Sequence, residues 1–527
     1  MLFIDHGTVV DGTGAGARQA SVLVDGDSIR EVRRGLQAPP RAERIDASGL
    51  VVAPGFIDMH AHEFGVLTDP AADSKLRQGV TTELVGVCGM SPAPVRGRGV
   101  EEVLSRLRGF GRYEGEVTWR SLAEFFDLVR RTGLLTNCAW LVGHGTVRAS
   151  VLGYENRPAT GDELAEMKAL VREGMADGAW GLSSGLIYPP GMYASTEELI
   201  GLARVAARSG GLYVSHIRGE GQTVFAAVQE AIRIAREAEI GTHISHLKVM
   251  GRELWGRSGD LRALIEAANR EGLDVTYDVY PYRAASTVMS ALLPGWTYEG
   301  GPEALVERMG DASARARARA DIEAGKTIFQ AVGWDMVLVV ESERPGRAGK
   351  TVAQIAAEEG KDPYDAAFDL LREEPQVQCV LFAMDERDVR ENLCGPFAMV
   401  GSDSLLGMRP EGPLSRGKPH PRTYGTFPKV LRWLVREERA LSLEEAVHRM
   451  TGKAAAKLGL ADRGVLAPGK KADLAIFDPA TVADRATYTD PHRYPDGIRY
   501  VLVNGEVAVG PEGTRPGLFG QVLLHGT

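Results

Sequence analysis

The feature that most constrains the fold is a repeated pattern between about residue 55 and residue 403. A short apolar run predicts a buried strand, and in most cases an amphipathic segment follows that predicts a helix, for example 161–178, 195–210, 223–238 and 260–272. Eight such runs end near His62, Cys88, His144, Leu186, His216, His246, Val279 and Asp403. Alternating strands and helices require parallel strands joined by crossover helices. The pattern therefore predicts an α/β fold with a TIM-like (β/α)8 barrel.

The two ends of the chain have a different pattern, with short strands and turns. Asp25-Gly26 and Asn504-Gly505 both lie between alternating runs and predict hairpin turns. We predict that residues 1–54 and 465–527 together form one small β domain, a sandwich or barrel, and that residues 55–464 form the large barrel. The long gap between the seventh and eighth strands predicts an insertion at about 287–350, near the barrel mouth.

Composition excludes several classes of function. The net charge of −9 argues against nucleic-acid binding, which needs a basic face, whereas a small-molecule substrate is compatible with it. The four cysteines are far apart and form no CxxC pair, so we predict no disulfides. The first residues lack the features of a signal peptide, and no apolar run could span a bilayer. We expect a cytoplasmic protein without a membrane partner; the sequence does not give its oligomeric state.

Candidate metal ligands lie where the predicted strands end. An apolar run from residue 50 to residue 59 predicts a buried strand that leads into His60 and His62, on the same face. Such a pair alone is weak evidence, because HxH is common by chance. The other strand ends add donors of the types that Zn²⁺ prefers, and active sites of barrels lie at these ends. The candidate ligands are His60, His62, Cys88, His216, His246 and Asp403.

Several motifs around these residues resemble those of one enzyme family. GFIDMHAH, VGVCG, VSHIRGEG, ISHLK, YDVYPY, VGSD and HPRTYGTFP are similar to motifs of the amidohydrolase superfamily. The similarity is greater to its N-acyl-D-amino-acid deacylase (D-aminoacylase) branch. It extends from about residue 51 to residue 428, and the β segments at both ends also fit it. One departure is Glu63, where family members often have an aspartate; it could tune the weaker metal or the pocket entrance.

The resemblance implies a specific metal centre. One Zn²⁺ would be held tightly, with the ligands Cys88, His216 and His246. A weaker second position would be served by His60, His62 and Asp403, with Cys88 as a candidate bridge. Many binuclear amidohydrolases instead use a carbamylated lysine at the end of strand four. Residues 179–185 contain no lysine, which favours the cysteine-bridged branch.

Catalysis and substrate binding follow from a metal and one carboxylate. Zinc polarises an amide carbonyl and lowers the pKa of water, and Asp403 would act as general base and then as general acid. The alternative is that Asp403 only binds metal. Lys248 lies two residues after His246 and could neutralise a substrate carboxylate. Tyr280, Ser286 and Arg422 are substrate contacts by similarity to the family.

We therefore predict zinc-dependent hydrolysis of N-acyl-D-amino acids to a carboxylate and a free D-amino acid. The preference for D comes only from the resemblance. The apolar stretch 290–296 favours hydrophobic side chains, whereas Arg283 could pair with an acidic one, as in an N-acyl-D-glutamate or N-acyl-D-aspartate deacylase. A cyclic-amide hydrolase of the hydantoinase or dihydroorotase type is a further alternative. So is a non-catalytic barrel that serves in assembly, although that function would tolerate loss of the ligands.

Overall fold

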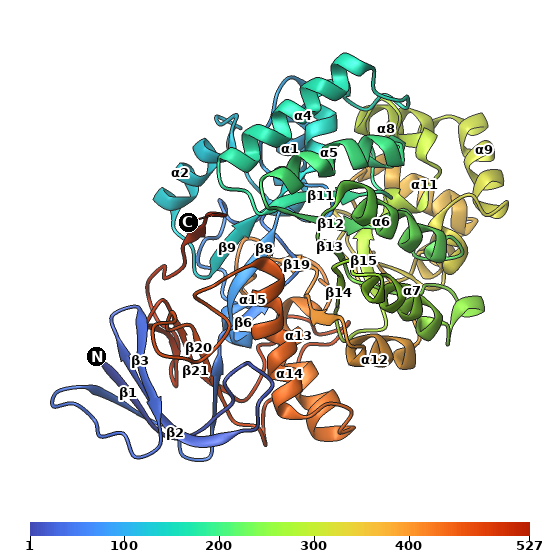
Figure 1. Cartoon of the computed structure of the whole chain (residues 1–527). Coiled ribbons are helices and arrows are strands. Elements are labelled where there is room, and N and C mark those ends of the chain that lie inside the picture. The colour runs from blue at the N-terminus through green and yellow to red at the C-terminus, as the bar shows by residue number, and fades with distance from the viewer. Residues whose placement is uncertain (527) are drawn as a thin grey trace.

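The computed structural model describes residues 1–526 and has a mixed α/β fold (Figure 1). Its parallel strands are β6 (Phe56–Asp58), β7 (Ala61–His62), β8 (Val80–Val85), β9 (Asn137–Trp140), β10 (Val142–Gly143), β11 (Gly181–Gly185), β12 (Leu212–His216), β13 (Thr242–Ile244), β14 (Val275–Val279), β18 (Ala398–Val400) and β19 (Ser404–Leu405). The helices between them are α1 (Arg98–Gly111), α2 (Leu122–Thr132), α3 (His144–Leu152), α4 (Gly161–Ala176), α5 (Thr196–Arg208), α6 (Val224–Ala238), α7 (Ser258–Arg270) and α12 (Glu386–Cys394).

Hydrogen bonds join these strands in chain order. Parallel pairing connects β6, β8 and β9, and then β10, β11, β12, β13, β14 and β18. The amide of Trp180 donates to the carbonyl of Trp140 at 2.8 Å, which links β9 to the start of β11. The last strand returns to the first, because the amide of Met59 donates to Val400 at 3.2 Å and β19 pairs with β7. The carboxyl ends of all these strands therefore lie on one side.

Local sequence explains where several helices begin. Ser121 and Glu124, Thr160 and Glu163, and Thr351 and Gln354 form reciprocal capping boxes at the starts of α2, α4 and α10 (Val352–Glu359). Each box satisfies backbone amides that the first turn of a helix leaves without partners. The apolar faces of α4, α5 and α6 are buried against the strands, which fixes the helices as a layer around them.

The two ends of the chain form one sheet of nine strands, at the lower left of Figure 1. It contains β1 (Leu2–Val9), β2 (Arg18–Asp25), β3 (Ser28–Arg33), β4 (Glu43–Asp46), β5 (Val51–Pro54), β20 (Leu474–Phe477), β21 (Ile498–Val503), β22 (Glu506–Gly510) and β23 (Gly513–Thr514). Strand β5 lies between β1 and β20, so it joins the N-terminal strands to the C-terminal ones. The final strand, β24 (Val522–Leu523), pairs instead with β9.

The predicted single strand over residues 50–59 is wrong. The structure divides this run at Gly55 into β5 of the terminal sheet and β6 of the parallel set. A Cβ at Gly55 would lie 2.2 Å from the hydroxyl oxygen of Thr81 on β8, so the chain passes β8 here at a distance that only glycine permits. Apolarity alone does not indicate which of two sheets a strand joins, and this is why the division is not visible in the sequence.

A separate layer lies between β14 and β18. It contains an antiparallel sheet of β15 (Ala285–Val288), β17 (Gln378–Leu381) and β16 (Val337–Val339), in that order. The helices of this segment are α8 (Pro302–Gly310), α9 (Ala312–Glu323), α10 and α11 (Pro363–Glu373), and they lie at the upper right of Figure 1. The segment that departs from strand–helix alternation therefore extends to Leu381. The chain continues with α13 (Arg422–Lys429), a π-helical turn at 430–437, α14 (Leu443–Met450) and α15 (Gly452–Leu458).

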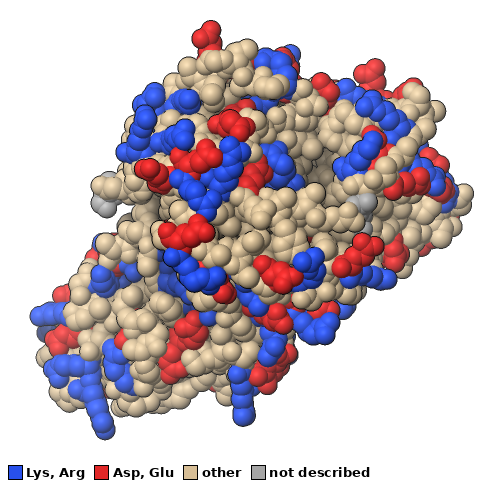
Figure 2. Space-filling view, turned by 45° about the vertical axis from the view of Figure 1, so that its right-hand side comes forward, with Lys and Arg blue, Asp and Glu red and all other residues tan. Residues whose placement is uncertain are grey.

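The surface and the helices agree with the composition. Figure 2 shows Lys and Arg side chains interspersed with Asp and Glu over the visible face. Such a face offers no continuous positive stripe of the kind that binds nucleic acid. Within residues 1–526, no helix has both the length and the apolar character needed to cross a membrane.

Candidate metal centre

Six side chains with metal-binding atoms meet beyond the carboxyl ends of the parallel strands. They are His60, His62, Cys88, His216, His246 and Asp403. Cys88 is central, because its Sγ lies 3.3 Å from His60 Nε2, 3.6 Å from His216 Nδ1 and 3.7 Å from His246 Nε2. His62 keeps 16% of its side chain exposed and is the donor that opens towards solvent. The structure thus brings the six candidate ligands together at one place.

The spacing around Cys88 fits a zinc ion. Zn–S and Zn–N bonds of about 2.0–2.3 Å in a tetrahedron separate the ligand atoms by about 3.3–3.8 Å. The distances from Cys88 Sγ to His216 Nδ1 and His246 Nε2 lie in this range. Burial alone would raise the pKa of the Cys88 thiol, but the charge on His60 and hydrogen bonds from the histidines hold it well below its usual range. Cys88 is therefore suited to be a thiolate, the form that binds metal.

A second group of donors shares this corner. His60 Nε2 lies 3.4 Å and His62 Nε2 3.3 Å from Asp403 Oδ1. These three atoms could hold a second cation. Cys88 is also close to this second group, because its Sγ lies 3.3 Å from His60 Nε2. Asp403 is the only one of the six donors with a carboxylate, and it contacts both His60 and His62.

Glu220 lies on the far side of two of these histidines and is not among the residues predicted from the sequence. Its Oε1 is 3.2 Å from His246 Nδ1 and 3.6 Å from His216 Nε2, the nitrogens that face away from Cys88. The ammonium of Lys248 lies 2.6 Å from the same oxygen and 2.7 Å from His246 Nδ1. Because a positive group already occupies this side, we assign Glu220 to orienting the two rings rather than to binding metal. Its spacing of four residues from His216, in VSHIRGEG, was the available signal.

We expect Glu220→Gln to weaken zinc binding by about 10–100-fold, the usual effect of removing a carboxylate that orients metal-binding histidines. The amide keeps the shape but not the charge that the two rings share. Competition between the protein and a chromophoric chelator would measure the affinity. Glu253→Gln, which changes an exposed carboxylate, is the matched control. Equal zinc affinity in the two variants would contradict this role for Glu220.

Three of the donors have an unusual backbone. Cys88, His246 and Asp403 have φ values of +54°, +36° and +52°, in the left-handed region that non-glycine residues seldom adopt. Each such residue costs about 1–3 kcal/mol, which the surrounding structure must offset. Each follows the end of its strand, β8, β13 or β18, and turns the chain sharply there. Strain concentrated at three donors is typical of a functional site.

A buried carboxylate connects the first and last strands beneath the donors. Asp58 Oδ1 accepts hydrogen bonds from the backbone amides of His60, at 3.0 Å, and Ser402, at 2.8 Å. Its Oδ2 accepts one from Lys75 Nζ at 2.6 Å, and the same ammonium lies 3.0 Å from Glu83. All three charged side chains are inaccessible to solvent. Asp58 thus fixes the backbone next to His60 and next to Asp403 at once.

Replacing Lys75 with Met would leave Asp58 and Glu83 buried without their cation. We expect the free energy of unfolding to fall by about 3–5 kcal/mol, the typical cost of breaking a buried ion pair from one side. Lys471→Met, which removes the partly exposed pair with Asp27, should cost about 0–1 kcal/mol. Urea unfolding of both variants would measure the difference. Equal losses of unfolding free energy in the two variants would show that the buried Lys75 cluster contributes no more to stability than the exposed pair.

Asp278 has a similar function on the opposite side. Its Oδ1 accepts a hydrogen bond from the backbone amide of His246 at 3.0 Å, and its Oδ2 lies 3.6 Å from His60 Nδ1. His243 Nε2 lies 3.0 Å from the same Oδ2. Asp278 was not identified from the sequence, although an acid inside the apolar run VTYDVY was a signal that it is paired.

Of the four predicted substrate contacts, Ser286 and Arg422 line the same cavity as Asp403, and Arg422 and Lys248 already have charged partners. Arg422 Nη1 lies 2.8 Å from Asp403 Oδ2, and its guanidinium packs on the ring of Tyr280 at 4.8 Å. Ser286 accepts a hydrogen bond from Arg422 Nη2 through its backbone oxygen. Lys248 is bound to Glu220, and since β13 ends at Ile244 it does not share a strand face with His246 as predicted. It lies 5.6 Å from the Tyr280 ring.

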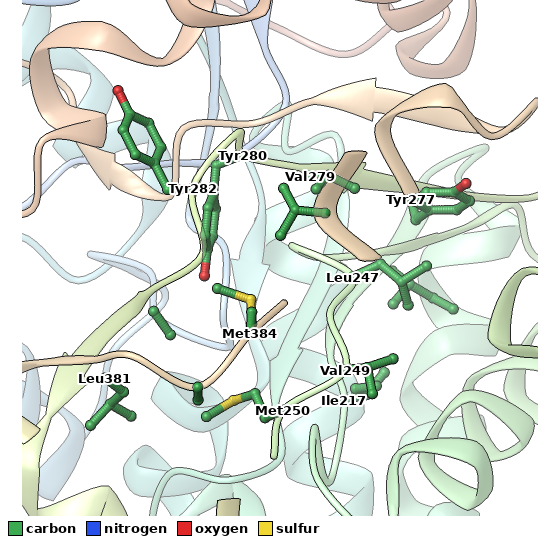
Figure 3. Close-up of a cluster of buried hydrophobic side chains, with 14 of the residues drawn as sticks. Ile217, Leu247, Val249, Met250, Tyr277, Val279, Tyr280, Tyr282, Leu381 and Met384 are labelled. Atoms are coloured by element: carbon green, nitrogen blue, oxygen red, sulfur yellow. The ribbon is translucent and has the colours of Figure 1, made fainter. Parts of the chain in front are cut away.

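Tyr280 has an uncommitted hydroxyl. Figure 3 shows the hydroxyls of Tyr280 and Tyr282 pointing in opposite directions, with Tyr280 on the side of Met384. The Tyr280 hydroxyl is buried and makes no hydrogen bond to any residue that the structure describes. A buried donor without a partner is uncommon and is available for a ligand.

Two other sequence hypotheses are not supported by the positions of the side chains. Arg283 is exposed and does not line the cavity beside the donors, so it is not placed to pair with an acidic substrate side chain there. Glu63 is buried, and its Oε2 accepts a hydrogen bond from the amide of Gly86 at 2.9 Å. Glu63 therefore supports the loop before Cys88 rather than the pocket entrance.

A cavity of about 130 Å³ opens beside the donors. His62, Cys88, Asp403, Ser286 and Arg422 line one end of it. A molecule in this cavity would contact metal-binding atoms, a carboxylate and a guanidinium together. This combination suits hydrolysis of a bond near a negatively charged group.

Comparison with known proteins finds similarity to one family of hydrolases in sequence and in structure. The model of the "Amidohydrolase family" matches residues 43–324 and 412–509. A D-aminoacylase of Alcaligenes xylosoxydans xylosoxydans is 39% identical over 96% of this chain and 93% of its own length. A crystal structure of D-aminoacylase with a binuclear metal centre superimposes with a TM-score of 0.84, at 37% identity over 99% of both chains. N-acyl-D-glutamate deacylase from Bordetella bronchiseptica, complexed with zinc and a phosphonate mimic of the tetrahedral intermediate, gives 0.82 at 36% identity, over 99% of both chains.

Proposed function

The chain belongs to the amidohydrolase family, and we propose that it hydrolyses N-acyl-D-amino acids to a carboxylate and a free D-amino acid with the help of zinc. One observation carries this proposal: Cys88 Sγ lies at the spacing of zinc ligands from both His216 Nδ1 and His246 Nε2, in a cavity that the carboxylate of Asp403 also lines. The similarity to D-aminoacylase over nearly the whole chain supports a linear amide as the bond that is cleaved.

We assign the closed order of parallel strands to a (β/α)8 barrel of residues 55–464, and we extend the insertion predicted at about 287–350 to Leu381, where β17 ends. Residues 1–54 and 465–527 are assigned to a small β domain. Active sites of such barrels lie at the carboxyl ends of the strands. The six donors are at these ends, which supports the assignment.

One zinc ion would be held tightly by Cys88, His216 and His246. A weaker second position would use His60, His62 and Asp403, with Cys88 as the shared ligand. When bound, zinc polarises the amide carbonyl and lowers the pKa of water to about 7. The chain itself must then orient the substrate and move one proton.

Asp403 is the group that would move this proton. Burial alone would raise the pKa of its carboxyl, but Arg422, His246 and His60 hold it well below the usual range. Asp403 is therefore ionised at neutral pH and can accept a proton from the attacking water. It would then donate this proton to the leaving amine, as a general acid.

Four side chains would bind the substrate: Lys248, Tyr280, Ser286 and Arg422. Arg422 offers a positive charge at the cavity, and the Tyr280 hydroxyl is free to donate to a carboxylate. Lys248 would add an ammonium donor beside Tyr280, whose ring lies 5.6 Å away, while Glu220 balances its charge. A carboxylate next to the scissile amide is what an N-acyl amino acid presents.

The test is amine release from N-acetyl-D- and N-acetyl-L-amino acids by the zinc-loaded enzyme, with Met, Leu, Phe, Glu and Asp side chains. We expect D-selective release, highest with a hydrophobic side chain. Preference for D-Glu or D-Asp would instead establish the acidic deacylase. Turnover of cyclic amides but no linear one would contradict the proposal. That outcome is disfavoured because strand β11 and the residues before it, 179–185, contain no lysine.

A further inference from the structure

One wall of the cavity beside the donors is made of aromatic rings. The ring of Phe64 stacks on that of His62, with centroids 5.5 Å apart and planes 9° apart. Phe110 stacks on Phe64 in turn, at 5.1 Å and 22°. This ladder of three rings leads from a metal-binding histidine towards the solvent. It forms one continuous wall of the cavity.

The remaining walls are mixed. Polar side chains such as Gln378 and Glu341 alternate with apolar ones from different parts of the chain, which are Met90, Val288, Val340, Leu405, Met408 and Leu414. Leu414 and Met408 are almost fully buried, whereas Leu405 and Val288 are half-buried. The volume of about 130 Å³ is close to the ~150 Å³ of an engineered apolar cavity in another protein that binds benzene. The space therefore suits a short aliphatic chain or one phenyl ring.

The position of the cations indicates which part of a substrate lies here. The amide carbonyl carbon carries the acyl chain on one side and the nitrogen, with its α-carbon, on the other. The α-carbon bears the carboxylate, which would lie at Arg422, near Tyr280 and Lys248. A separate cavity of about 740 Å³ has Met250, two residues along the chain from Lys248, in its wall, and we assign it to the amino-acid branch. Phe64 and Phe110 belong neither to the site of the carboxylate nor to the cavity of the amino-acid branch. Their wall is therefore left for the acyl branch.

We propose that the cavity walled by Phe64, Phe110, Val288, Leu405, Met408 and Leu414 is an acyl subsite that selects apolar acyl groups longer than acetyl. The inference rests on the proposed function and makes it more specific: it names the acyl class. At the solvent side, Arg416 is exposed and Arg112 forms an ion pair with Glu341. A charged acyl group such as succinyl is therefore the competing substrate that the test must include.

The experiment compares N-acetyl-, N-butanoyl-, N-hexanoyl-, N-benzoyl- and N-succinyl-D-leucine with the zinc-loaded enzyme. Each methylene that becomes buried should raise kcat/KM about fourfold. Butanoyl, with two more methylenes, should therefore exceed acetyl about 15-fold, hexanoyl should be at least as good as butanoyl, and succinyl should be poorer than both. An acetyl or succinyl preference would overturn the inference.

Variants of the wall connect the preference to this cavity. Phe110→Ala should lower the hexanoyl-to-acetyl ratio of kcat/KM about tenfold, and Val288→Phe, which fills the space, should lower it too. Phe225→Ala removes a half-buried ring elsewhere, on α6, and should leave the ratio as in the wild type. If the wall variants change selectivity for the D side chain and not for the acyl chain, the cavity holds the other branch and the inference is wrong.

The outcomes also separate this inference from the proposed function. If N-acetyl-D-leucine is hydrolysed but the length of the acyl chain has no effect, only the acyl subsite is refuted. If none of the linear amides is hydrolysed, the deacylase proposal itself fails, and the acyl subsite fails with it.

Discussion

Asp403→Asn is expected to reduce kcat by about 10²–10⁴-fold, the range that a positioned general base contributes, with little change in zinc content. The amide cannot accept the proton of the attacking water. Asn keeps the shape of the side chain and one oxygen towards His60 and His62. Cys88, His216 and His246 are not altered by the substitution, so the tightly held zinc should remain.

The measurement is kcat and KM for N-acetyl-D-leucine, with metal content determined on the same samples. Asp69→Asn is the matched control, because Asp69 is buried and paired with Arg409 and is not among the six donors. Its kcat should stay within a few-fold of the wild type. If Asp403→Asn kept more than a tenth of the wild-type kcat while binding zinc, Asp403 would be a metal contact only.

Cys88→Ser is expected to remove the tightly held zinc, and with it nearly all activity. Its Sγ lies within 3.7 Å of three histidine nitrogens and is the atom that both donor groups share. A serine hydroxyl remains protonated in the same position and is a poor zinc ligand. The loss of zinc affinity should exceed the roughly 10–100-fold expected when only an orienting partner is removed.

Cys138→Ser provides the control for this substitution. Cys138 is also fully buried, but burial raises the pKa of its thiol, and its Sγ contacts only the backbone oxygen of Thr136 among the hydrogen-bonding groups. Zinc per chain and turnover should be close to the wild type. Retention of one tightly bound zinc in Cys88→Ser would refute the assigned ligand set.

The donors can be predicted from the sequence for a physical reason. Parallel strands that follow one another in a sheet bring their carboxyl ends to the same side. Residues that end successive strands in the sequence therefore lie close together in the structure. His60, Cys88, His216, His246 and Asp403 each end or follow such a run. Four strand–helix units were also visible, because their helices carry regular apolar faces.

Other parts of the site could not be predicted because they depend on tertiary contacts. Asp58 and Asp278 bind backbone amides from distant segments, and no spacing in the sequence reveals such partners. The positive φ values at Cys88, His246 and Asp403 belong to residues that seldom adopt them. Lys248 was assigned by strand periodicity, which does not apply beyond Ile244, where β13 ends. In each case the tertiary structure determines the position, and the local sequence does not.

The most direct test of the account is a zinc titration of the metal-free enzyme with N-acetyl-D-methionine as substrate. The protein is stripped with a chelator, zinc is added in increments, and bound metal and released D-methionine are measured together. We predict no turnover without metal, a rise in rate that follows the first equivalent of zinc, and no comparable release from N-acetyl-L-methionine. Full turnover by metal-free protein, or no release of D-methionine by protein that has bound zinc, would contradict the account.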